Sequence, residues 1–288
     1  MATLRDIRRR IASVKSTQQI TKAMKMVAAA KLRRAQEQLV NSRPYAYRLN
    51  QMLAHVAARE DRGMHPLLEE REPRTVCYIV VAADRGLCGS FNANVLRKSK
   101  GEIDGHEAET TLKVVAVGRK SHEFYSRRGY PVVKSFTGFF NRMHYQHALD
   151  IARFVREMYE QRECDRVFVV YNQFKSAAVQ RVAVEQLLPI EPEEPEVDKY
   201  LPAEYLFEPS VQQILNLLCP RNLDTQVWRV LLESYAAEQG ARMVAMESAT
   251  DNAQEMIHDL TLYYNKVRQS AITKEILEIV AGAEALKG

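Results

Sequence analysis

Both ends of the chain are long stretches without helix-breaking residues, and these stretches limit the folds that are available. Residues 2–59 contain no glycine and a single proline, and residues 222–281 contain no proline and a single glycine. A helix rises about 1.5 Å per residue, so sixty-odd residues form a rod on the order of 95 Å. Helices of globular domains average about 11–12 residues. A compact domain has no room for either segment as one helix.

Both end segments carry a hydrophobic pattern that predicts packing against another helix. Apolar or small residues recur at alternating spacings of three and four. In the first segment, Gln18 and Thr21 are polar positions of this register, and we expect the apolar face there to shift to Ile20, Met24 and Val27. The register positions of the two segments are Leu4, Ile7, Ile11, Val14, Ala28, Leu32, Ala35 and Leu39, and Ala249, Ala253, Met256, Leu260, Tyr263, Val267, Ser270 and Lys274.

Local signals predict where these helices begin and where they are interrupted. Thr3 stands three residues before Asp6 and is expected to cap the first helix, although the second position of a capping box is usually Glu or Gln. Pro44 predicts a kink or local irregularity in that helix. Pro209 and Pro220 are expected to enclose a short helix ahead of the last long one.

The middle of the chain has a different pattern, in which strands alternate with helices. This alternation predicts a small, largely parallel α/β domain. Residues 179–188 are expected to add an edge strand, and acidic, proline-containing residues 191–208 read as a solvated linker. The expected strands are 75–82, 112–117, 132–136 and 167–171, and the expected helices include 121–128 and 147–161.

The order of these segments predicts the architecture. One long helix enters the α/β domain and the other leaves it, so the two helices must be antiparallel if they pair. We therefore expect an α/β protein in which two antiparallel terminal helices form a coiled-coil shaft with the small α/β domain at its base. The predicted parts are a shaft helix at 1–60, the α/β domain at 75–190, the linker at 191–208 and a second shaft helix at 209–288.

Charge is concentrated at the N-terminus. The net charge is only +5, yet residues 1–40 hold ten Lys and Arg residues against Asp6 and Glu37. Such a surface suits either nucleic acid or acidic protein loops. The stretch lacks aromatic residues for base stacking, which disfavours a single-strand binder. A nucleic-acid-binding coiled coil remains the alternative function at this stage.

Signals for catalysis are weak. The four cysteines lack metal-ligand spacing and are expected to be reduced thiols, and His144 and His147, three residues apart, are expected to lie on the surface. The turn at residues 84–92 (DRGLCGSFN) could cradle a phosphate on backbone N–H groups, but its spacing fits no nucleotide motif. A structural turn with Ser90 or Asn92 as helix cap is the favoured interpretation. The charged N-terminus does not resemble a signal peptide, and no apolar run reaches membrane-spanning length.

Several segments together resemble the γ subunit of F-type ATP synthases of the bacterial type. The resemblance covers both ends and the middle of the chain, while residues 97–165 match only in outline. The matching segments are 11–31 (IASVKSTQQITKAMKMVAAAK), 84–92, 205–209 (YLFEP), 233–234, 242–253 (RMVAMESATDNA) and 264–276 (YNKVRQSAITKEI).

The resemblance implies a central rotor stalk with a Rossmann-like α/β foot. In that family the shaft stands in a ring of three α and three β subunits, which bind Mg-ATP and Mg-ADP, and the foot rests on the membrane c-ring and ε. It implies one copy per complex, no active site, cofactor, metal or nucleic acid in this chain, and a peripheral location on the cytoplasmic face of the bacterial inner membrane. Proton flow through the c-ring would then be coupled to ATP synthesis or hydrolysis.

The resemblance also implies contact residues, position by position. Contacts to β subunits fall on Lys22, Met24, Lys25, Arg242, Arg268, Gln269 and Thr273. Contacts to the c-ring and ε fall on Tyr205, Phe207 and Glu208. Lys25 stands where many members of the family have Glu.

Overall fold

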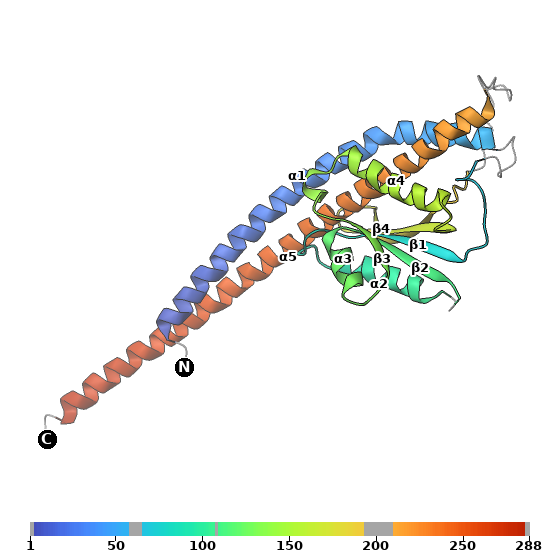
Figure 1. Cartoon of the computed structure of the whole chain (residues 1–288). Coiled ribbons are helices and arrows are strands. Elements are labelled where there is room, and N and C mark those ends of the chain that lie inside the picture. The colour runs from blue at the N-terminus through green and yellow to red at the C-terminus, as the bar shows by residue number, and fades with distance from the viewer. Residues whose placement is uncertain (1–2, 58–64, 107–108, 193–209, 286–288) are drawn as a thin grey trace. The chain divides into compact units, whose positions relative to one another are not determined.

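The computed structural model describes residues 3–57, 65–106, 109–192 and 210–285. The chain divides into two compact units. The helical-pair unit comprises residues 1–27 and 243–288, and the α/β unit comprises residues 28–242. Two long helices, α1 (Leu4–Ala57) and α5 (Val211–Ala285), contribute to both units (Figure 1).

Helix α1 begins with the predicted cap. The Asp6 backbone N–H donates to Thr3 Oγ1 at 3.3 Å, and the Thr3 backbone N–H donates to Asp6 Oδ2 at 3.1 Å. This reciprocal pair forms a capping box in which Asp takes the place usually held by Glu or Gln. The Thr3 hydroxyl also donates to Asp6 Oδ2 at 2.7 Å, and this bond together with that from the Thr3 backbone N–H lowers the pKa of Asp6, which keeps a negative charge at the positive end of the helix.

Two of the prolines lie inside the long helices. Helix α1 runs through Pro44, and α5 runs through Pro220. The expectation that Pro220 closes a separate short helix is therefore wrong. Next to Pro220, Leu218, Cys219 and Leu223 are buried in the main hydrophobic cluster. This packing holds the helix together across the backbone hydrogen bond that proline cannot make.

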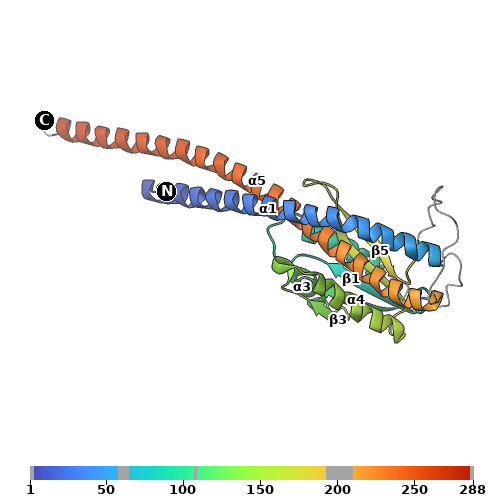
Figure 2. The same ribbon diagram turned by 90° about the horizontal axis from the view of Figure 1, so that it is seen from above.

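Within the helical-pair unit, α1 and α5 lie side by side and run antiparallel, as the segment order predicted (Figure 2). The side chains that face the partner helix follow the three-four register on α1, including Thr21. The predicted shift of the apolar face is wrong in part, because Ile20 is 57% exposed and Val27 is 55% exposed, while Met24 is half-buried. Beyond residue 267, every described side chain of α5 through residue 284 is exposed.

The α/β unit contains a five-stranded sheet with the order β3-β2-β1-β4-β5. All neighbouring strands are parallel except β4 and β5, which are antiparallel. This confirms the largely parallel sheet and its added edge strand. The strands are β1 (Thr75–Val81), β2 (Thr111–Val117), β3 (Val132–Phe136), β4 (Arg166–Phe174) and β5 (Gln180–Leu188).

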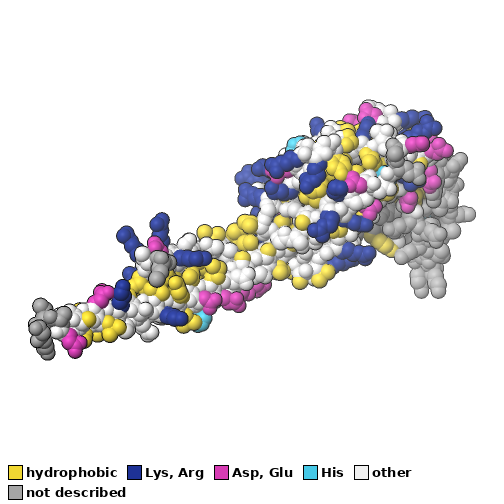
Figure 3. Space-filling view, turned by 90° about the horizontal axis from the view of Figure 1, so that it is seen from below, with side chains coloured by type: hydrophobic (Ala, Val, Ile, Leu, Met, Phe, Trp, Pro, Cys, Tyr) yellow, Lys and Arg dark blue, Asp and Glu magenta, His cyan; other side chains and the backbone are white. Residues whose placement is uncertain are grey.

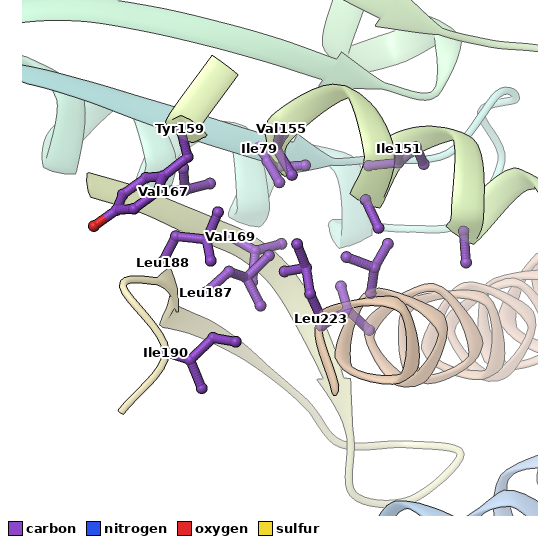
Figure 4. Close-up of a cluster of buried hydrophobic side chains, with 14 of the residues drawn as sticks. Ile79, Ile151, Val155, Tyr159, Val167, Val169, Leu187, Leu188, Ile190 and Leu223 are labelled. Atoms are coloured by element: carbon purple, nitrogen blue, oxygen red, sulfur yellow. The ribbon is translucent and has the colours of Figure 1, made fainter. Parts of the chain in front are cut away.

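Helices cover both faces of this sheet. The even-numbered side chains of β1 pack against α2 (Phe91–Asp104) and α3 (Arg119–Ser126). The odd-numbered side chains of β1 pack against α4 (Tyr145–Glu160) and the α/β-unit parts of α1 and α5. Figure 4 shows Ile79, Val155, Val169 and Leu223 of this second cluster. Successive side chains of β1 point to opposite faces of the sheet. Because both faces are covered, the strand is apolar along nearly its whole length.

One tight approach between backbones requires glycine. Gly118 follows β2 with φ +86°, and a Cβ placed there would lie 1.9 Å from the carbonyl oxygen of Ala82. Gly129 has a similar φ of +73° but open space around its Cα. The two glycines therefore separate the effect of steric overlap from that of backbone conformation.

We expect Gly118→Ala to lower the free energy of unfolding by at least about 2 kcal/mol more than Gly129→Ala. In both variants alanine must adopt a positive φ, which costs roughly 1–2 kcal/mol. Only alanine at position 118 would also overlap with the backbone of Ala82 and force it to move. Urea unfolding of the purified chain measures both values. Equal losses in the two variants would contradict the assignment of Gly118 to a steric role.

Candidate functional site

Four polar pairs join α1 to α5 across the helical-pair unit. In each pair, one side chain comes from the N-terminal part of α1 and the other from the C-terminal part of α5. They take the place of apolar contacts in the seam, which is the line of facing side chains between α1 and α5. The pairs are Arg8–Tyr264 (2.7 Å), Gln18–Gln254 (2.5 Å), Thr21–Thr250 (2.8 Å) and Lys25–Glu247 (2.6 Å).

The predicted contact residues on α1 differ in their surroundings. Lys22 is exposed and Met24 is half-buried. The Lys25 ammonium group donates to Glu247 within the chain, with side-chain exposures of 37% and 49%. The positive charge of Lys25 is thus already paired before any other chain approaches, whereas that of Lys22 is directed to the outside.

Arg242 lies in the α/β unit and is largely enclosed. Its guanidinium group contacts Glu238 one turn earlier at 2.7 Å, and the two side chains are only 12% and 6% exposed. It also donates to the carbonyl oxygen of Gly86 at 3.3 Å. Burial raises the pKa of Glu238, and Arg242 opposes that rise. Arg242 therefore holds α5 to the turn after β1.

Arg268, Gln269 and Thr273 lie on the exposed last part of α5. The Thr273 hydroxyl donates to the carbonyl oxygen of Gln269 at 2.9 Å, so it is used within its own helix. Large apolar side chains are also exposed on this part, and Figure 3 shows apolar side chains between charged ones on the paired helices. An exposed apolar surface of this kind marks an interaction site. The exposed apolar residues are Ile272, Ile276, Leu277, Ile279 and Val280.

The remaining predicted contacts cannot be placed. Tyr205, Phe207 and Glu208, together with most of the predicted linker 191–208, lie outside the described residues.

The turn at residues 84–92 is filled by side chains of the chain itself. The Asp84 carboxylate accepts backbone N–H groups from Arg119 at 3.0 Å, Gly138 at 2.9 Å and Phe140 at 3.3 Å. These donors lie at the carboxyl ends of the parallel strands, where α/β folds commonly bind ligands. The carboxylate thus joins the segments that follow β2 and β3 to the turn after β1.

Asn92 completes this turn, although in a different way from the predicted cap. It lies inside α2, and its Oδ1 accepts the backbone N–H of Ala83 at 2.9 Å. Ser90 occupies the N-cap position without a capping hydrogen bond from its side chain. Cys88 and Phe91 pack against Ala237 of α5 in the same place. The structural interpretation of the turn accounts for all of these contacts.

The histidines and cysteines of the described residues do not gather into a metal site. No group of three or more His, Cys, Asp or Glu side chains is placed to hold a metal ion there. His147 stacks on Phe139, and its Nδ1 accepts the His144 backbone N–H at 3.1 Å, so it has a structural role. All four cysteines are free and buried. Burial raises the pKa of both Cys164 and Cys219 to about 12, which keeps these thiols protonated.

Among the described residues, no helix combines sufficient length with sufficient hydropathy to cross a bilayer.

Sequence reasoning missed the partners of its own predicted residues. Glu247, Tyr264 and Glu238 were not singled out, although Glu247 and Tyr264 fall within the quoted segments of α5. An antiparallel alignment of the two helices, anchored on one pair, would have placed Glu247 opposite Lys25. Glu238 carried a local signal, because Glu and Arg four residues apart on a helix form ion pairs.

Comparison with known proteins gives a consistent result over the whole chain. A family model described as ATP synthase matches residues 3–286. The chain is 49% identical to the ATP synthase gamma chain of Chlorobaculum parvum and 50% identical to that of Desulforamulus reducens, with full coverage of both chains in each case.

Solved structures show the same fold. The central stalk and c-ring structure of the Tetrahymena thermophila mitochondrial ATP synthase contains a chain with a TM-score of 0.61 and 28% identity, covering 80% of this chain and 99% of that one. A chain in the Euglena gracilis mitochondrial enzyme has a TM-score of 0.68 at 21% identity, covering 98% and 94%, and supports the fold alone. Because the family model and the curated relatives span its length, this chain belongs to the ATP synthase family.

Proposed function

We propose that this chain is the central rotor stalk of an F-type ATP synthase. The observation that carries the proposal is the full-length match to gamma chains, together with an α5 end whose exposed apolar residues have no partner among the described residues. Burying those residues inside a ring of other subunits would remove their apolar surface from water.

The asymmetry of the helical pair explains how a chain without its own active site can act on three sites. Two helices of unequal extent present a different surface in each direction. A ring of three equivalent subunits around them cannot keep three equivalent conformations, because each subunit adopts the one that its facing surface favours. Turning the stalk would then pass each site through the same sequence of states.

The proposed partners follow from this role. They are the α and β subunits of an α3β3 ring, the ε subunit and the c-ring, with one stalk per complex. Mg-ATP and Mg-ADP would be bound by the partner subunits, and this chain would contribute no catalytic group or cofactor site. The complex would hold the chain at the cytoplasmic face of the bacterial plasma membrane, driven by proton flow.

Specific residues are proposed for these contacts. Lys22, Met24 and Lys25 would face acidic loops of β subunits, with Lys22 supplying the unpaired charge. Arg268, Gln269 and Thr273 would meet β subunits at the exposed end of α5. Arg242 would reach β only at its exposed edge, because most of its side chain is used within the α/β unit. Contacts to the c-ring and ε are proposed for Tyr205, Phe207 and Glu208.

The nucleic-acid alternative has lost its support. The family match and the curated relatives are ATP synthase chains over the full length. Within the basic segment, Lys25 is paired with Glu247 and Arg33 is paired with Glu37.

Gentle isolation of the tagged chain from membranes at low salt tests the proposed assembly. We expect α and β subunits to co-purify with Mg-ATP hydrolysis, because the exposed end of α5 requires a covering partner. Recovery of a lone chain, or of a chain bound to nucleic acid, would overturn the proposal.

The α5 contacts are tested by Arg268→Glu combined with Gln269→Leu. We expect ATP synthesis in membrane vesicles to fall about fivefold, the equivalent of about 1 kcal/mol, because both side chains are exposed and available to a partner. The thermal stability of the chain should not change. Arg74→Glu, a charge reversal at an exposed side chain of the α/β unit, is the matched control. Unchanged synthesis in the double variant would refute these contacts.

The internal role of Arg242 is tested by a double-mutant cycle with Glu238. Glu238→Gln and Arg242→Gln should each lower the free energy of unfolding by about 3 kcal/mol, because each leaves a buried charge without its partner. The double variant should lose at least about 1 kcal/mol less than the two single losses combined. Additive losses in urea unfolding would show that the two side chains act independently.

A further inference from the structure

One corner of the sheet is only partly covered by the helices on its face. Helices α2 and α3 lie on the same side of the sheet, where α3 packs on β2 and β3 while α2 crosses β1, β4 and β5 (Figure 1). Helix α2 begins over β4, where the Asn172 amide donates to the carbonyl oxygen of Phe91 at 3.3 Å. The segment after its last turn reaches β1 instead, where His106 is hydrogen-bonded to Tyr78. The amino end of β4 and the adjoining part of β5 are therefore left partly open.

A cavity of about 400 Å³ occupies this corner. Its apolar wall is made by Phe168 of β4, Val184 of β5 and Pro73. The Phe168 ring stacks on that of Tyr78 with 5.5 Å between the centroids, yet Phe168 and Val184 are only half-buried. Sites for small ligands commonly enclose about 300–1,000 Å³ and combine apolar walls with a few polar groups. The cavity thus has the size and the lining of a small-molecule site.

Arg166 brings a positive charge to this cavity that the chain does not use itself. Its side chain lines the cavity and is half-buried, yet its guanidinium group forms no hydrogen bond or ion pair with any described residue. Arginine side chains drawn partly out of water usually have a partner, because a charge that loses hydration without one is unfavourable. The other charges at the rim offset each other, since Glu102 forms an ion pair with Lys98 at 2.5 Å. The charge left over at the cavity is therefore positive.

The other polar groups of the cavity can donate hydrogen bonds. The Tyr78 hydroxyl and His106 Nε2 lie 2.6 Å apart, and burial raises the pKa of Tyr78 to about 12, which keeps the phenol protonated. The neutral pair carries two polar hydrogens, one on the phenol and one on the imidazole, and only one of them lies between the two rings. The other hydrogen and the Thr110 hydroxyl are left to bind an acceptor. The cavity is therefore richer in donors than in free acceptors.

We propose that this cavity binds a small organic anion, with its oxyanion at Arg166 and Thr110 and its apolar body against Phe168 and Val184. A guanidinium group recognises carboxylate and phosphate oxygens through parallel N–H donors. The apolar wall removes the remainder of such a ligand from water. Carboxylates and phosphate monoesters share this chemistry, and the experiment distinguishes them. The proposal goes beyond the rotor function, because all of these residues belong to the α/β unit of one chain.

Binding is measured on the purified full chain by isothermal titration and by saturation-transfer NMR of the ligand. The anionic probes are phenylbutyrate and phenyl phosphate, and phenylbutanol is the neutral analogue. We expect a Kd on the order of 1 mM for the anion that fits better, as is usual for a ligand of about a dozen atoms. The alcohol should bind at least about tenfold more weakly, because it cannot form a charge-assisted hydrogen bond with the guanidinium group. The better anion identifies the oxyanion as a carboxylate or a phosphate.

Substitutions of Arg166 test the charge. Arg166→Gln should weaken binding of the anion at least about tenfold, and Arg166→Lys should weaken it less, because an ammonium group keeps the charge but lacks the paired donors. Neither variant should change the melting temperature, since the guanidinium group has no partner among the described residues. Arg181→Gln, at an exposed arginine of β5, is the matched control and should leave the Kd unchanged.

Val184→Phe tests the apolar wall independently of the charge. A larger side chain at this half-buried position should fill the cavity from β5, while phenylalanine remains a favourable residue in a strand. We expect saturation transfer to both anions to be lost. Val184→Thr keeps the shape of the side chain and should retain binding. The melting temperature of each variant shows whether it folds, and if Val184→Phe does not fold, the Arg166 variants decide the question by themselves.

Absence of saturation transfer from the chain to both anions would overturn the proposal. Binding that is unchanged by Arg166→Gln and by Val184→Phe would overturn it as well, because the anion would then bind elsewhere on the chain. Equal binding of the alcohol and the anions would contradict the role of Arg166. None of these measurements requires another subunit, so a chain that binds the anion but purifies alone would support the site and refute the rotor function.

Discussion

The α/β unit depends on the packing of α5 across one face of the sheet. Leu223, Val227 and Leu231 of α5 are buried in the same cluster as Ile79 and Val169 of the sheet. Burial of each such side chain contributes roughly 1.5–3 kcal/mol, enough to carry the helix through Pro220. The same helix supplies Arg242 and Ala237 at the turn after β1. A helix that serves as part of a globular core is thereby also held firmly where it leaves that core.

The turn after β1 has the strand–turn–helix geometry at which α/β folds commonly bind ligands, and here it makes contacts within the chain. Strand, turn and helix are arranged as in nucleotide-binding folds, with N–H groups gathered at the carboxyl ends of parallel strands. Asp84 supplies the negative charge internally and joins three segments that are distant in sequence. Its carboxylate ties the segments after β2 and β3 to the turn after β1. This explains why the turn resembles a phosphate cradle in sequence while acting as an anchor for α5.

Sequence patterns predicted the elements of this protein better than the details of its seam. Period-two and three-four spacing report burial directly, and for that reason the strands and the long helices were predictable. The antiparallel arrangement followed from the order of the segments, and the cap followed from the spacing of Thr3 and Asp6. Ile20 and Val27 were expected inward because they are apolar, yet they are exposed, and Gln18 and Thr21 face the partner helix instead. Apolar character does not separate a residue buried within the chain from one suited to contact another chain. The enclosure of Arg242 depends on Glu238 and on the distant Gly86, which no local pattern contains.

The placement of polar and apolar residues on the helical pair follows from what each surface must do. An apolar seam would bury more apolar surface, whereas the polar side chains of this seam are satisfied by hydrogen bonds between the two helices. Apolar side chains on the outside would be unfavourable in a free chain, but they gain energy when other subunits cover them. Thr21 is buried between the two helices and Ile20 is exposed, which reverses the usual distribution of polar and apolar side chains. Polar groups of the seam are satisfied by side chains of the other helix, while the outer apolar side chains remain available to another chain.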